Sequence, residues 1–110
     1  MASNELSAAP IVSEYASDPD MLELIEMFVT ELPTRIDAIL DACQKNDLAT
    51  IATVAHQIKG AGGGYGYPML TDVAKALEMG AKAAKDAATV KEQVDALVAM
   101  CKGVQAGFKS

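Results

Sequence analysis

The residue best suited to chemistry is His56, the only histidine of the chain, which opens the segment HQIKGAGGGYGYP at residues 56–68. Lys59 follows three residues later, and the segment also contains five glycines. Glycines near a lysine can surround a phosphate with backbone N–H groups, whereas an accessible imidazole can itself act as a nucleophile. The segment therefore suggests either a phosphate-binding loop or a histidine that carries a group.

The glycine spacing does not fit a phosphate-binding loop. A dinucleotide-binding fingerprint needs glycines at i, i+2 and i+5, and every i, i+2 glycine pair here has tyrosine or methionine at i+5. A P-loop needs its lysine after the glycines and a strand before them, but Lys59 precedes them and falls in a predicted helix. The nucleophilic role is favoured.

The helical periodicity around His56 indicates that its ring faces solvent. Each residue of a helix advances by about 100°, so His56 points more than about 90° away from the middle of the apolar stripe. Lys59 is the only large residue among its surface neighbours. The stripe is Leu48, Ile51, Ala55 and Ile58, and the other neighbours are Ala52, Thr53, Gly60 and Gly63. We interpret the small residues as leaving space beside His56 for a bulky partner. The alternative is that they permit close helix packing, or that the helix ends within residues 62–66.

A carboxylate is expected beside the ring. If the chain reverses direction near Tyr67, then His56 and Glu78, each eleven residues from it, lie level on two antiparallel helices. A carboxylate that holds one imidazole nitrogen would fix the tautomer and leave the other nitrogen free to attack. The alternative is a Glu78 that is simply solvated.

Hydrophobic periodicity is helical throughout, and it predicts an all-α protein, an antiparallel up-down four-helix bundle. The first helix opens at SDPD, residues 17–20, where Ser17 or Asp18 can cap it and Pro19 fits the first turn. It is predicted to continue as one helix, kinked at Pro33, to the KND turn at 45–47. The second carries His56, and the third follows Pro68. The last helix is predicted to start at a capping box, TVKE at 89–92, and to run to Phe108. Residues 17–110 would form the bundle and residues 1–16 an arm or a short helix.

Composition narrows the possible functions. With 110 residues the chain makes one domain, and its net charge of −6 argues against binding to nucleic acid or anionic membranes. Residues 1–10 lack the features of a secretion signal and no apolar run reaches membrane-spanning length, so we expect a cytoplasmic protein. Cys43 and Cys101 are expected to be buried free thiols, with no disulfide and no metal site. No second apolar face is evident, which favours a monomer.

The chain resembles the histidine-containing phosphotransfer (HPt) domains, a family that includes the phosphorylated domain of chemotaxis kinases. That family has the pattern HxxKG, then a glycine ten residues after the histidine, a leucine after fourteen and Glu or Gln after twenty-two. The matching residues here are His56, Lys59, Gly60, Gly66, Leu70 and Glu78. An upstream F...LP pattern also matches, at Phe28, Leu32 and Pro33.

The resemblance implies a phosphorelay intermediate in two-component signalling. His56 would take a phosphoryl group from an aspartyl phosphate on one receiver domain, for example of a hybrid sensor kinase, and pass it to another, for example of a response regulator. Lys59 would balance the phosphoryl charge, and the receiver would supply Mg²⁺, so the chain would need no cofactor and no ATP-dependent kinase activity of its own. The alternative is a non-catalytic helical module that binds a receiver or another signalling partner without phosphotransfer.

Overall fold

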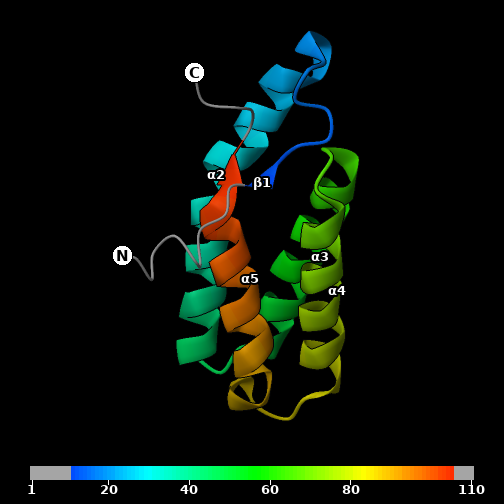
Figure 1. Ribbon diagram of the computed structural model, residues 1–110. Coiled ribbons are helices and arrows are strands. Elements are labelled where there is room, and N and C mark those ends of the chain that lie inside the picture. Colours follow the sequence, from blue (N-terminus) through cyan, green and yellow to red (C-terminus); the bar gives the residue numbers. More distant parts are fainter. Residues whose placement is uncertain (1–10, 106–110) are drawn as a thin grey trace, which may run out of the picture.

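The computed structural model describes residues 11–105, which form an antiparallel bundle of four α-helices, as predicted (Figure 1). Successive helices run in opposite directions along the long axis of the bundle, and two very short strands pair at one end. The elements are β1 (Ile11–Val12), α2 (Pro19–Gln44), α3 (Leu48–Gly64), α4 (Pro68–Ala83), the 3₁₀-helix η1 (Ala87–Val90), α5 (Lys91–Gly103) and β2 (Val104–Gln105). None of these helices is both long and apolar enough to cross a membrane.

Helix α2 starts and continues as its sequence predicts. The Asp18 carboxylate accepts a hydrogen bond from the backbone N–H of Asp20 at 2.9 Å, and Pro19 occupies the first turn, where its missing N–H is not needed. Pro33 lies inside the helix without dividing it. Its side chain is on the exposed side, so the apolar stripe passes beneath it unbroken.

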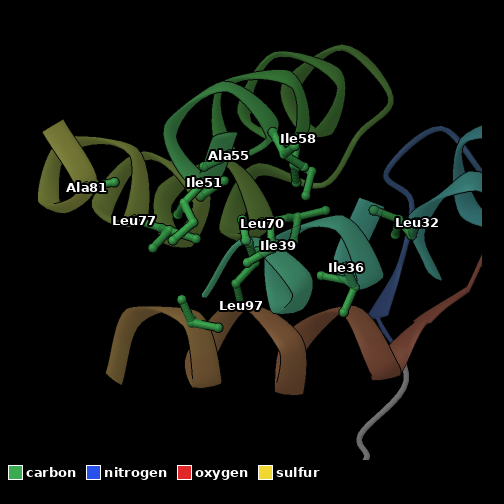
Figure 2. Packing of buried hydrophobic residues seen from close by; sticks show 14 of the residues in the cluster. Leu32, Ile36, Ile39, Ile51, Ala55, Ile58, Leu70, Leu77, Ala81 and Leu97 are labelled. Atoms are coloured by element: carbon green, nitrogen blue, oxygen red, sulfur yellow. The ribbon is translucent and has the colours of Figure 1, made fainter. Parts of the chain in front are cut away.

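The core is built from the apolar stripes of the four helices, as Figure 2 shows. Side chains from neighbouring helices meet in the centre and are almost fully shielded from water. The labelled members are Leu32, Ile36 and Ile39 of α2, Ile51, Ala55 and Ile58 of α3, Leu70, Leu77 and Ala81 of α4, and Leu97 of α5. Because the stripes of α3 and α4 face this core, the residues next to them in sequence lie at its rim.

Helix α3 extends through the glycine-rich segment and ends at Gly64. A side chain on Gly62 or Gly63 would come within 3.2 or 3.3 Å of Thr71 Oγ1 on α4, so these two glycines permit the close approach of the two helices. Gly60 is different, because nothing lies within 4 Å of the place its Cβ would occupy. Close packing therefore explains Gly62 and Gly63 but not Gly60.

The predicted start of the last helix is wrong. Thr89 does not cap α5; its backbone N–H and its hydroxyl both donate to Asp86 Oδ1, at 3.1 and 2.8 Å. Asp86 thereby starts η1, and α5 begins only at Lys91, with Val90 as an N-cap that makes no side-chain bond. The helix also ends at Gly103, before β2, and Phe108 lies outside the described residues.

Residues 11–16 form an arm across one end of the bundle rather than a short helix. Strand β1 pairs in parallel with β2, with Ile11 opposite Val104. The arm then reaches the turn between α3 and α4, where the Ser13 hydroxyl donates to the Tyr65 carbonyl and the Glu14 N–H donates to the Gly66 carbonyl at 2.9 Å. The rest of the expected arm, residues 1–10, lies outside the described residues.

Gly66 is required by the contact between the arm and the turn. Its φ of +91° is a conformation that residues with a side chain rarely adopt, and a Cβ there would collide with the Ser13 hydroxyl and lie 2.9 Å from the Glu14 nitrogen. We expect Gly66→Ala to lower the free energy of unfolding by about 1–3 kcal/mol, measured by urea denaturation. Gly64→Ala is the matched control, because it has no close neighbour and should be neutral or slightly stabilising. Equal stability of the two variants would contradict this account.

Candidate functional site

His56 lies on the solvent side of α3, as its helical position predicts. The preceding residue, Ala55, is fully buried in the core, while the His56 side chain is 64% exposed. Thr53 and Gly60, one turn to either side, are also exposed and small. The ring is therefore open to a large partner while its helix is held firmly by the core.

Glu78 lies directly opposite His56, as the hairpin geometry predicts. Its Oε2 atom is 2.9 Å from His56 Nδ1, so the two side chains join α3 to α4. Glu78 is not the solvated residue of the alternative interpretation, since its side chain is only 5% exposed. An ionised carboxylate can only accept hydrogen bonds, so Nδ1 carries the ring proton and the Nε2 of a neutral imidazole has a free electron pair.

Two lysines also bind the Glu78 carboxylate. Lys59 Nζ lies 2.7 Å from Oε1, and Lys82 Nζ lies 3.0 Å from Oε2, the oxygen that also accepts from His56. Hydrogen bonds from Lys59 and then Lys82, with a smaller one from His56, hold the pKa of Glu78 at about 2 against the opposing effect of burial. The Glu78 carboxylate thus stays charged although its side chain is almost completely buried.

Sequence reasoning identified Lys59 and Glu78 but missed Lys82. The available signal was the spacing of Glu78 and Lys82, four residues apart on one helix, which is a common ion-pair arrangement. That spacing alone does not distinguish an ordinary surface pair from a pair beside the histidine. The missing information was the burial of Glu78, which brings both lysines to one carboxylate.

The family model for the Hpt domain matches residues 23–107, a range that contains His56, Lys59, Gly60, Glu78 and Lys82. The chain belongs to the Hpt domain family. Searches of curated proteins and of solved structures found no significant match. Membership supports a phosphotransfer role in two-component signalling and interaction with receiver domains.

Beside the histidine of this Hpt domain lies an open groove of about 360 Å³. Helices α3 and α4 form its two sides, and the imidazole and the Glu78 carboxylate both line it. The lining residues are Ala52, Thr53, His56, Gln57, Glu78 and Lys82. Lys59 is not among them, because its ammonium group reaches Glu78 from the next turn of α3.

Neither of the two cysteines of the Hpt domain lines this groove. Cys43 and Cys101 are free and partly buried thiols, and burial raises the pKa of Cys101 to about 12. Such a thiol stays protonated and unreactive near neutral pH. Within residues 11–105, no group of three or more His, Cys, Asp or Glu side chains is arranged to hold a metal ion.

The lowered pKa of Glu78 predicts how the stability of the domain depends on pH. Above the ordinary glutamate pKa near 4.5, Glu78 is charged in the folded and unfolded chains and its full contribution to stability is present. As the pH falls towards 2, the unfolded chain binds a proton that the folded chain resists, and this contribution is lost.

We therefore expect the stability gap between the wild type and Glu78→Gln to be largest above about pH 5 and to shrink towards pH 2. Urea denaturation at several pH values measures this gap. Glu26→Gln is the control, since Glu26 is exposed and forms no ion pair within the described part of the chain. A gap for Glu78→Gln that stays constant from pH 5 to pH 2 would show that the carboxylate is not held in its charged form.

Proposed function

We propose that this Hpt domain is a phosphorelay intermediate that carries a phosphoryl group on His56 between the aspartates of two receiver domains. The observation that supports this most directly is the bond between His56 Nδ1 and Glu78 Oε2 in a ring that is otherwise open to solvent. In a neutral imidazole this bond places the proton on Nδ1, so that Nε2 keeps an accessible electron pair, which is what a nucleophile needs. The donor would be the receiver of a hybrid sensor kinase and the acceptor that of a response regulator, or the reverse.

The chemical step is a displacement at phosphorus. The Nε2 electron pair forms a bond to the phosphorus of the aspartyl phosphate, while the bond from phosphorus to the aspartate oxygen breaks and its electrons return to the receiver carboxylate. The imidazole then carries a positive charge, because Nδ1 still holds its proton. Glu78, fixed at 2.9 Å from that nitrogen, stabilises this charge as it forms. In the onward step a carboxylate oxygen of the next receiver's aspartate forms a bond to phosphorus, while the bond from phosphorus to Nε2 breaks and its electrons return to Nε2.

The domain contributes the nucleophile and its orientation, and the receiver contributes the rest. Glu78, the carboxylate beside His56, is already bound by the ring and by two lysines, so it is poorly placed to ligate a cation. We therefore assign the Mg²⁺ that phosphoryl transfer needs to the receiver domain. Entry of the phosphoryl group from a receiver also means that the domain requires no ATP-dependent kinase activity of its own.

The first test is the site of phosphorylation. Incubation with a receiver domain labelled on its aspartate should transfer one phosphoryl group to the wild type, in a linkage that is labile in acid and stable in alkali, and none to His56→Gln. Both proteins should show the same cooperative unfolding, since His56 is exposed. A helical module that only binds its partner would capture the receiver without taking label, and label retained by His56→Gln would place the chemistry elsewhere.

Gly60 provides a second test, because the function assigns it the role of leaving room for the receiver. It lies one helical turn beyond His56, where a long side chain leans back towards the ring, and a Cβ there has no neighbour within 4 Å. Gly60→Gln should preserve or raise the free energy of unfolding, by up to about 1 kcal/mol, and yet slow transfer severalfold by obstructing docking.

Gly60→Ala should show the same opposition in milder form, with a similar gain in stability and a smaller loss of rate. Thermal melts and transfer rates measured on the same preparations compare the two properties. Clear destabilisation combined with normal transfer by the remaining folded protein would overturn the docking role of Gly60.

A further inference from the structure

Lys82 is an ammonium group beside the histidine that the proposed function leaves without a role. It lies one turn beyond Glu78 on α4, lines the groove next to the imidazole, and shares Glu78 Oε2 with His56 Nδ1. Its side chain is 65% exposed, compared with 29% for Lys59, and its contact with Glu78 is longer, at 3.0 Å against 2.7 Å. Of the two lysines, Lys82 is held less tightly and is freer to move.

The charges around Glu78 are not balanced in the unphosphorylated domain. One ammonium group is enough to neutralise the carboxylate, so the second leaves an excess of positive charge beside the imidazole. A protein-bound phosphoryl group carries close to two negative charges near neutral pH. The excess charge is thus of the correct sign for an anion arriving on the ring.

Position distinguishes the two lysines. Lys59 makes the shorter contact with Glu78, and its backbone carbonyl accepts a hydrogen bond from the Thr71 hydroxyl at 3.0 Å, which ties this turn of α3 to α4. Glu78 is almost buried, and a buried carboxylate that lost both cations would be strongly destabilised. If one lysine stays with Glu78 while the other turns to the phosphoryl group, the geometry selects Lys59 to stay and Lys82 to turn.

We propose that Lys82 is a catalytic residue that neutralises the phosphoryl group on His56, while Lys59 remains bound to Glu78. The inference rests on the proposed function, and it transfers to Lys82 the charge-balancing role that the sequence assigned to Lys59. As the bond from Nε2 to phosphorus forms and the bond from phosphorus to the leaving group breaks, Lys82 Nζ leaves Glu78 Oε2 and pairs with the phosphoryl oxygens. The Nδ1–H of His56 and the ammonium group of Lys59 keep the carboxylate in place.

The decisive experiment uses phosphoramidate as a small phosphoryl donor, so that receiver docking plays no part. In this reaction the phosphorus–nitrogen bond of the donor breaks and its nitrogen takes up a proton and leaves as ammonia. Lys82→Ala should be phosphorylated on His56 roughly tenfold more slowly than the wild type, and Lys82→Arg should recover most of the rate. Lys85→Ala is the matched control: it removes the same charge from an exposed lysine that has no ion pair within the described residues, and its rate should be that of the wild type.

Nuclear magnetic resonance separates contact with the phosphoryl group from an indirect effect through Glu78. In the unphosphorylated domain, the ¹⁵N signals of the His56 ring should shift less in Lys82→Ala than in Lys59→Ala, because Lys59 makes the shorter contact with the carboxylate. In the phosphorylated domain, the ³¹P signal should shift in Lys82→Ala. All variants should unfold cooperatively, because neither lysine belongs to the apolar core.

The possible outcomes separate this inference from the function on which it rests. Phosphorylation of Lys82→Ala by phosphoramidate at the wild-type rate would overturn the catalytic role of Lys82 but not the proposed phosphorelay function. If the same variant then accepted the phosphoryl group from a receiver more slowly than the wild type, Lys82 would be assigned to partner docking. An unchanged ³¹P signal in Lys82→Ala, combined with ¹⁵N shifts as large as those of Lys59→Ala, would also overturn it. A wild-type domain that accepts no phosphoryl group on His56 from either donor would overturn the proposed function itself.

Discussion

The carboxylate of Glu78 is the interaction on which the site depends. It is almost buried between α3 and α4, yet it remains charged because three donors surround it. Burial of a charge is unfavourable unless partners compensate for the lost hydration, so the carboxylate fixes the positions of its partners as firmly as they fix its charge. The orientation of His56 is therefore set from the rim of the core, although the ring itself lies in solvent.

This arrangement requires α3 and α4 to pack closely, and the glycine-rich segment permits that packing. Gly62 and Gly63 let α3 approach Thr71, whose hydroxyl bonds to the carbonyl of Lys59. Gly66 serves a different purpose, since its positive φ makes the turn on which the arm rests. These glycines, which lie together in the sequence, thus have separate structural reasons. Packing does not explain Gly60, because a Cβ there would have no neighbour within 4 Å.

The features that sequence reasoning predicted correctly depend on short-range geometry. The outward direction of His56 follows from helical periodicity, and its pairing with Glu78 follows from counting along a single hairpin. The error in the predicted start of the last helix also has a local cause. Asp86 and Thr89 are both good capping residues, and the N–H and the hydroxyl of Thr89 donate to Asp86, so Thr89 does not cap α5. The sequence left an arm and a short helix open for residues 1–16, because the partners of the arm, β2 and the Gly66 turn, are remote in sequence and leave no periodic signal.

Lys82 shows why a functional cluster is harder to find than a fold. Lys82 lies four residues after Glu78, a spacing that is common among exposed ion pairs on helices. Such pairs contribute little to stability because water already solvates both charges. Here one member of the pair is withdrawn from water and also holds the histidine, so a second cation on the same carboxylate gives the site an excess of positive charge. A phosphoryl group on the ring would bring negative charge next to this excess. The charges of the cluster are therefore complementary to the phosphoryl group that we propose for His56, and this complementarity depends on the burial of Glu78, which a count of sequence positions does not reveal.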